Sequence, residues 1–327
     1  MIRAKLANTV ELDYPTDKLE VIAVSDASSD GTDDIVSTFG DPRVKLLRMS
    51  QRGGKTVGLN AAVKAARGDI VVFSDANAMY VCDAIRKMVR NFADAKVGAV
   101  VGESTYADGT GGAQQSESLY WKYETGIKRL ETQLGSTVGG DGAIYAIRRN
   151  LYRDMRPDAL SDFVNPMQIV MSGYRCIYEP EARSVEEAGD GFDVEFRRKV
   201  RIVNRAWRAV WTLPALLNPL RFGLFSFTLI SHKLLRWLLP VFLLAPYVLN
   251  LPLLDAGAIY RWTFGAQVVI YALALLGYLA RGRASLPRAL AVPYYFCLVN
   301  IASARGIFEA YRGQTYTTWA TPRAMTK

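Results

Sequence analysis

The chain has 327 residues, enough for one ordinary globular domain and a further region. Forty Lys and Arg against 31 Asp and Glu give a formal net charge of +9, but no recognised nucleic-acid motif accompanies it, so no nucleic acid is expected as a partner. The three cysteines stand far apart without metal-type spacing, which argues against a disulfide framework and a zinc site.

The first 190 residues alternate apolar runs with amphipathic stretches. The run at 19–24 ends at Ser25 and Asp26, as a strand buried on both faces of a parallel sheet would. Further strands are predicted at 44–47, 70–73, 97–101 and 143–147, and helices at 33–39, 56–66, 85–92 and 114–134. This order predicts a doubly wound α/β domain over residues 1–190.

The predicted helix at 114–134 carries apolar residues at helical spacing. They are Leu119, Tyr123, Ile127, Leu130 and Leu134. Such a stripe predicts the face that packs against the rest of the protein.

The second half of the chain has the composition of a membrane region. Basic amphipathic interfacial helices are predicted within 191–236, about three spans within 237–304, near 237–254, 263–280 and 287–304, and a polar tail over 305–327. The basic residues of 197–208 suit either an anionic lipid surface or a diphosphate. No signal peptide opens the chain, so we expect a multi-pass membrane protein with a cytoplasmic catalytic domain.

Acidic and amide side chains follow the predicted strands. Asp26 and Asp30 follow the first, Asp75 and Asn77 the third, and Asp162 comes after the glycine-rich turn at 139–142. Ligands bind at the carboxyl ends of such strands. Because so many carboxylates would repel an anionic substrate, we expect a divalent cation, Mg²⁺ or Mn²⁺, between them and phosphate. A general base must be a carboxylate, since the single histidine, His232, lies in an apolar stretch as an interfacial residue would.

The segments LEVIAVSDASSDGT, GGKTVGLNAA, SDAN, GGDGAIYAIRR and LSDF together resemble the family 2 inverting glycosyltransferases with a GT-A fold. The resemblance is closest to the membrane-bound polysaccharide synthases, which make hyaluronan, cellulose or poly-N-acetylglucosamine. It implies a UDP-sugar donor and a glycan or lipid-linked acceptor at the membrane lipid, with synthase or export subunits as further partners.

On the donor side, the resemblance implies that Asp26 contacts the nucleoside. Gly54, Lys55 and Asn60 match the family's nucleotide-side motif, and Lys55 can meet a phosphate. Asp75 matches the first residue of the metal motif and also belongs to the nucleotide site, while Asn77 replaces the motif's second Asp. The alternative is that Asp75 and Asn77 cap the next helix.

On the acceptor side, the resemblance makes Asp162 the catalytic base, with Ser161 where the family has Glu. Capping of the following helix is the alternative role for Asp162. Acceptor contacts are expected from the glycine turn and from one aromatic side chain, namely Gly140, Asp141, Gly142 and Trp121. Core packing is an equal alternative for Trp121.

The basic helix is expected to hold the leaving diphosphate through Arg198 and Arg201. The Gln and Trp of the family's processive motif are absent there, so processivity stays open.

Family members reach the segment resembling residues 12–15 only after a strand and a uracil-binding loop. This sequence begins within the helix that comes after that loop, so we expect a domain that lacks its first strand, because of a late start codon or a shortened chain. Inverting transfer from a UDP-sugar, in polysaccharide synthesis, is the leading hypothesis. The alternatives are a non-catalytic sugar-nucleotide-binding membrane protein and a sugar-nucleotidyltransferase.

Overall fold

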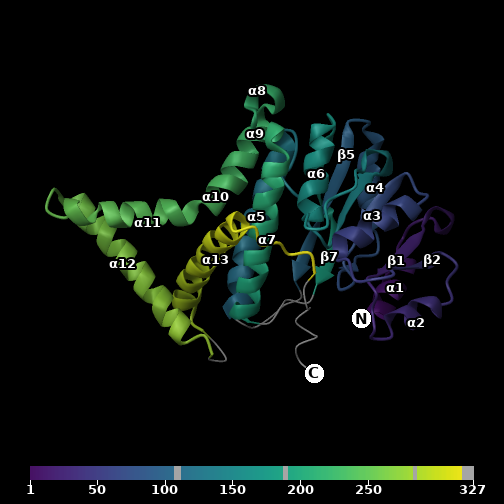
Figure 1. The fold of residues 1–327 in the computed structure, drawn as a ribbon, viewed down its shortest axis with the longest axis horizontal. Coiled ribbons are helices and arrows are strands. Elements are labelled where there is room, and N and C mark those ends of the chain that lie inside the picture. Colours follow the sequence, from purple (N-terminus) through teal and green to yellow (C-terminus); the bar gives the residue numbers. More distant parts are fainter. Residues whose placement is uncertain (107–111, 187–190, 283–285, 319–327) are drawn as a thin grey trace.

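The computed structural model describes residues 1–106, 112–186, 191–282 and 286–318, with only the backbone described at 106 and 112–122. Figure 1 shows an α/β part on the right and helices α11, α12 and α13 reaching out to the left. The α/β class and the apolar helices after it agree with the sequence analysis.

The α/β part opens with a small parallel sheet. Helix α1 (Ile2–Val10) leads to β1 (Val21–Ser25), α2 (Thr32–Ser37), β2 (Val44–Arg48) and α3 (Lys55–Ala65). Strand β1 pairs with β2 in parallel, with Val21 opposite Val44. The predicted strands and helices of this segment are confirmed to within two residues.

A second sheet has five strands in the order β3-β6-β5-β7-β4. These strands are β3 (Ile70–Phe73), β4 (Met79–Tyr80), β5 (Val97–Tyr106), β6 (Tyr145–Arg148) and β7 (Arg175–Glu186). Among its described pairs, β5 and β7 run parallel and the others antiparallel. The α/β class is confirmed, but the described strands form two sheets, and one of them is mixed instead of purely parallel. Strands β4 and β7 were not predicted.

The core of the second sheet continues into the helices beyond it. Phe73 stacks on Tyr145 with ring centroids 4.5 Å apart. The same cluster of buried side chains includes Met167 of α6 (Ser161–Met171), Trp207 of α7 (Phe192–Thr212) and Leu229 of the π-helical segment η5 (Leu229–Leu234). Sheet and membrane-side helices thus share one core.

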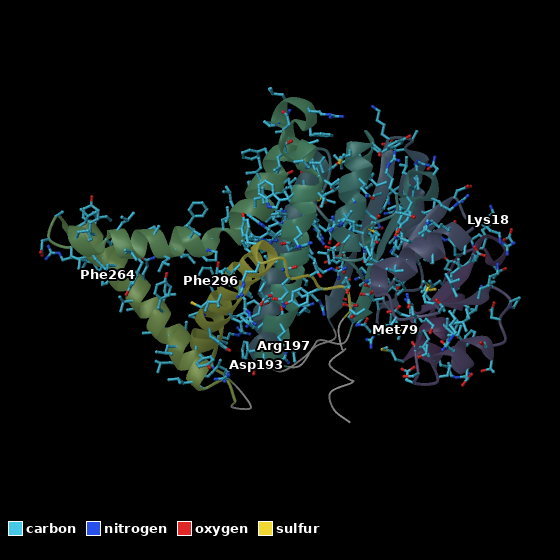
Figure 2. All side chains as sticks on the ribbon, in the orientation of Figure 1. Lys18, Met79, Asp193, Arg197, Phe264 and Phe296 are labelled. Carbon is cyan, nitrogen blue, oxygen red and sulfur yellow. The ribbon has the colours of Figure 1, made fainter. Side chains whose placement is uncertain are left out.

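The remaining helices are α4 (Ala84–Val89), α5 (Gly112–Leu134), α8 (Pro219–Phe222), α9 (Leu224–Thr228), α10 (Leu235–Trp237), α11 (Leu239–Leu249), α12 (Ala258–Leu279) and α13 (Arg288–Tyr311). Helices α12 and α13 are long and apolar enough to cross a membrane. The first predicted span is instead part of a pair of helices, Leu224–Trp237 and Leu239–Leu253, bent by 58°. The described residues therefore hold two to three candidate spans. Figure 2 shows the side chains of these helices and labels Phe264 and Phe296.

The apolar stripe predicted for α5 is on the wrong face. Tyr123, Leu130 and Leu134 are 56–60% exposed, whereas Glu124 and Glu131 are buried. Charged and polar groups on η5 and α10 pair with the two buried glutamates and compensate their loss of water.

Helices α7 and α13 approach each other closely at Gly306. A Cβ atom added there would lie 2.7 Å from the Val200 carbonyl oxygen and 3.1 Å from Val203 Cβ. We expect Gly306→Ala to push the helices apart and to destabilise the protein by about 1–3 kcal/mol, the usual cost of overpacking. Gly265→Ala is the matched control, because a Cβ on that helical glycine meets nothing within 4 Å. Thermal unfolding in detergent should show a lower Tm for Gly306→Ala alone; an unchanged Tm would contradict the close packing.

Candidate functional site

The turn before α3 is fastened by Asp26. Its Oδ1 accepts a hydrogen bond from the Gly53 amide at 2.7 Å and its Oδ2 one from the Gly54 amide at 2.9 Å. Gly54 has φ = +89°, and a Cβ there would lie 2.2 Å from the Thr317 carbonyl oxygen. Only glycine fits this position, because the chain after α13 runs directly over the turn.

Three predicted site residues converge at Gly142. A Cβ atom at this glycine would lie 3.4 Å from Lys55 Nζ, 3.6 Å from Asp75 Oδ2 and 3.7 Å from Asp162 Oδ2. Lys55 forms an ion pair with Asp75. Burial opposes the charge of Lys55, but Asp75 and Asp162 outweigh it and raise the pKa of the amine. Lys55 therefore stays a cation.

Asp162 is held in place by the glycine-rich turn and surrounded by other charged groups. Its backbone carbonyl accepts a hydrogen bond from the Gly140 amide at 2.5 Å. Burial raises the pKa of its carboxyl, Asp141 and Asp75 add to the rise, and Lys55 opposes it. The cap position of α6 is Leu160, and that of α4 is Asp83. The capping alternatives for Asp162, Asp75 and Asn77 are therefore not supported.

A fourth carboxylate, Glu186, belongs to the cluster and was missed from the sequence. It ends β7, and burial together with Asp141 and Asp75 raises its pKa to about 7, against the opposing charges of Arg198 and Lys55. No motif marks Glu186, and the strand that carries it was not predicted.

Helix α7 supplies the positive charge that faces these carboxylates. Burial, Arg205 and Arg198 lower the pKa of Arg201 to about 10, while Asp75 opposes that effect. Arg198 donates to Glu195 at 2.6 Å. Arg205, which belongs to the basic run 197–208 noted in the sequence, donates to Thr56 Oγ1 at 3.2 Å and to the Ala159 carbonyl.

Asn60 contacts a loop outside this group. Its amide donates to the Met155 carbonyl at 2.8 Å and accepts from the Tyr152 hydroxyl at 2.6 Å. Asn60 thus anchors the loop after β6, and its place on the nucleotide side stays a prediction. The side chain of Trp121 lies outside the described residues.

The oxygen donors of the site suit a hard divalent cation. Within the described residues, no group of three or more His, Cys, Asp or Glu side chains is placed to hold a metal alone. Mg²⁺, however, usually takes only one or two carboxylates and completes its shell with phosphates and waters. Asp75 and Asn77 offer such oxygens, and Asp141 Oδ2 is buried without a hydrogen-bond partner among the described residues. The residues therefore fit a cation that binds together with a diphosphate.

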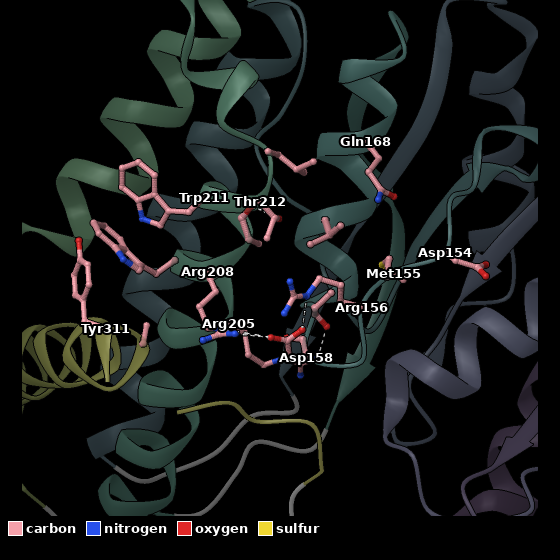
Figure 3. A pocket seen from close by; sticks show the side chains of 16 residues that line it. Asp154, Met155, Arg156, Asp158, Gln168, Arg205, Arg208, Trp211, Thr212 and Tyr311 are labelled. Atoms are coloured by element: carbon pink, nitrogen blue, oxygen red, sulfur yellow. Dashed lines mark hydrogen bonds and ion pairs between the residues drawn. The ribbon is translucent and has the colours of Figure 1, made fainter. Parts of the chain in front are cut away.

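A pocket of about 440 Å³ opens beside the site. Figure 3 shows aromatic side chains along one wall, including Trp211 and Tyr311, with Asp158 at the centre. Asp158 binds Arg156 at 3.2 Å and Arg208 at 3.0 Å. Arg205 lines the same pocket, so this hollow and the Asp162 site share a wall.

Residues 2–156 match the family described as "Glycosyl transferase family 2". The matched segment, slightly under half of the chain, is similar to family 2 glycosyltransferases. The chain is 36% identical over 218 residues to the probable glycosyltransferase YdaM of Bacillus subtilis (strain 168), covering 62% of this chain and 51% of YdaM. It is 27% identical over 188 residues to the poly-beta-1,6-N-acetyl-D-glucosamine synthase of Staphylococcus aureus (strain COL), covering 55% of this chain and 45% of the synthase. The chain thus spans about half the length of these curated relatives.

The α/β part and the helices after it also resemble a solved structure. The mannosyltransferase PcManGT from Pyrobaculum calidifontis, in complex with GDP-Man and Mn²⁺, superposes with a TM-score of 0.65. The alignment has 23% sequence identity and covers 96% of this chain and 84% of that chain. At this identity the likeness shows the shared fold, GT-A-like with apolar helices after it.

Asp26 provides a test of the turn before α3. We expect Asp26→Asn to loosen it, because an amide can accept from only one of the two glycine N–H groups and brings its own N–H₂ against the other. Losing a charge-assisted hydrogen bond costs about 1.5–3 kcal/mol, so amide exchange at Gly53 and Gly54 should rise about 10- to 100-fold. Asp30→Asn is the control, since the hydrogen bonds of Asp30 to Thr32 lie at the exposed surface, away from the turn. Equal exchange in both variants would rule out this role for Asp26.

Proposed function

We propose that this protein is a membrane-bound glycosyltransferase that moves a sugar, with inversion, from a UDP-linked donor to a hydroxyl of a glycan or lipid-linked acceptor. The observation that supports this most directly is the convergence of Lys55, Asp75 and Asp162 at Gly142. It places a cation, a metal-ligand candidate and a carboxylate of raised pKa around one backbone position without a side chain. A donor could approach closely there.

Asp162 has the properties of the general base. Burial, Asp141 and Asp75 raise the pKa of its carboxyl while Lys55 opposes the rise, so Asp162 is a stronger proton acceptor than a free aspartate. In the transfer, Asp162 takes the proton of the acceptor hydroxyl, the acceptor oxygen bonds to the anomeric carbon, and the sugar's bond to the diphosphate breaks. Attack opposite the leaving group gives inversion.

The departing diphosphate would meet positive charge from two elements. Lys55 lies at the start of α3, and Arg201 projects from α7 within electrostatic reach of Asp75. A divalent cation held by Asp75 and Asn77 would add charge neutralisation on the same diphosphate when bound. Such fixed positive charge stabilises the leaving group most as its own charge grows.

The relatives suggest the donor. Curated proteins that this chain resembles carry the names N-acetylglucosaminyltransferase and poly-beta-1,6-N-acetyl-D-glucosamine synthase, whereas the solved neighbour holds GDP-Man. We propose UDP-N-acetylglucosamine as the first donor to test, in the presence of Mg²⁺ or Mn²⁺ and with GDP-mannose as the competing donor. Release of UDP supports the proposal. Release of GDP alone would mean that GDP-mannose is the donor. Binding of a nucleotide sugar without any turnover would favour the non-catalytic alternative.

Asp162→Asn removes the proposed base and leaves its size unchanged. Turnover should fall about 10²- to 10⁴-fold, the usual contribution of a general base, while UDP binding measured by calorimetry stays within about threefold. Asp13→Asn is the control, because Asp13 is an exposed partner of Arg86 outside the cluster and the pocket. Turnover retained in Asp162→Asn would reject the base assignment.

The acid limb of the pH profile tests the coupling of Lys55 to Asp162. Activity requires ionised Asp162, so kcat should fall as the pH falls through its raised pKa. Lys55 lowers that pKa, so Lys55→Gln should raise it and move the acid limb to higher pH. Lys64→Gln, which removes an exposed lysine of the same helix, should leave the limb in place. A limb that stays fixed in Lys55→Gln would contradict the assignment, whatever happens to the height of the profile.

A further inference from the structure

A buried charged cluster joins α5 to the membrane-side helices. Its members are Glu124 and Glu131 of α5 together with His232, Lys233 and Arg236 of η5 and α10. The side chains of Glu131 and His232 are 3% and 5% exposed. So much charge inside a protein persists only where each group is paired.

His232 lies between the two glutamates. Its Nδ1 is 2.6 Å from Glu131 Oε1, and its Nε2 is 3.2 Å from Glu124 Oε2. Lys233 Nζ is 2.6 Å from Glu124 Oε1, and Arg236 also donates to Glu124. This is the only histidine of the chain.

Both ring nitrogens of His232 face hydrogen-bonding groups. Nδ1–H donates to Glu131 at 2.6 Å, and Nε2 lies 3.2 Å from Glu124 Oε2 and 3.4 and 3.3 Å from the Lys233 and Arg236 nitrogens. A short hydrogen bond to a carboxylate fixes both the tautomer and the ring orientation.

The second carboxylate oxygen of Glu131 binds the segment that leads into the glycine turn at 139–142. Glu131 Oε2 accepts from Thr137 Oγ1 at 3.0 Å and from the Val138 amide at 3.0 Å. Two residues further on, the Gly140 amide donates to the backbone carbonyl of Asp162 at 2.5 Å. A continuous path of hydrogen bonds and three backbone residues therefore runs from His232 to Asp162.

We propose that Glu131 and His232 are positioning residues, which set the glycine turn and through it Asp162 from the membrane-side helices. The proposal rests on the proposed function, because it assigns Asp162 as the base. The far end of the path lies in η5, within the bent helix pair that is a candidate span. The position of these helices in the bilayer therefore affects the position of Asp162 on the acceptor side of the site.

The amide nitrogen of asparagine can occupy the place of a histidine Nδ1–H, and leucine cannot donate. His232→Asn should therefore keep the bond to Glu131, and His232→Leu should lose it. Thr137→Val and Thr137→Ser form a second pair: valine removes the hydroxyl donor to Glu131 and serine retains it.

Each full-length variant is measured in nanodiscs, with rates divided by the concentration of UDP-binding sites from calorimetry. Unfolded protein then drops out of the comparison. We expect His232→Leu to lower this kcat at least tenfold with the donor KM within about twofold, and His232→Asn to recover it to within about threefold of the native chain. Thr137→Val should show a smaller loss that Thr137→Ser does not show. Full activity in His232→Leu, or equal losses in the Leu and Asn variants, would overturn the proposal.

Amide exchange over residues 137–142 supplies a readout that does not need turnover. Exchange should rise in His232→Leu and Thr137→Val, and stay native-like in His232→Asn and Thr137→Ser. If the native protein transfers no sugar but the exchange pattern holds, the proposed function fails while the positioning path stands. If the native protein is active and exchange does not respond, the path fails alone. Should His232→Leu leave no UDP-binding sites, the Thr137 pair decides.

Discussion

The crowding of carboxylates at one edge of the sheet is the constraint on which the rest of the structure depends. Burial raises the pKa values of both Asp162 and Glu186, and the nearby carboxylates Asp141 and Asp75 add to the rise. Lys55 is the nearest compensating charge, and α7 adds its arginines from the other side. A site with this balance accepts a dianionic diphosphate only together with further positive charge, which is the role a divalent cation takes.

Helix α7 contacts both the site and the candidate span α13. Trp207 belongs to the same buried cluster as Tyr145 of the sheet, and the close contact at Gly306 binds α7 to α13. Because α13 packs against α7, a shift of α13 would also move Arg201 and Arg205. The hydrogen-bonded path from His232 reaches the opposite side of the same site, so the membrane helices hold the carboxylates from two directions.

Strand ends and turn chemistry made part of the site predictable from the sequence. Asp26 and Asp75 were identified because an apolar strand ends just before each of them, and Asp162 because the segment LSDF resembles a family motif. The Gly142 turn needs no long-range information to be recognised. Glu186 could not be predicted, because its strand alternates charged with apolar residues and its raised pKa depends on neighbours that only the fold supplies. Asn60 matched a motif, yet its amide is satisfied by a loop almost a hundred residues further along the chain.

Burial of charge explains the remaining errors. On α5 the residues that pack inward are Glu124 and Glu131, so the apolar stripe pointed the wrong way, because a glutamate at helical spacing is normally a surface residue. The basic run of α7 likewise suited a lipid surface, but Arg205 is only 4% exposed and lies among the carbonyls beside Asp162. Part of the excess positive charge is therefore turned inward, against the acidic edge of the sheet. Composition reports the net charge of a chain, whereas function depends on which of those charges the fold removes from water and what it sets opposite them.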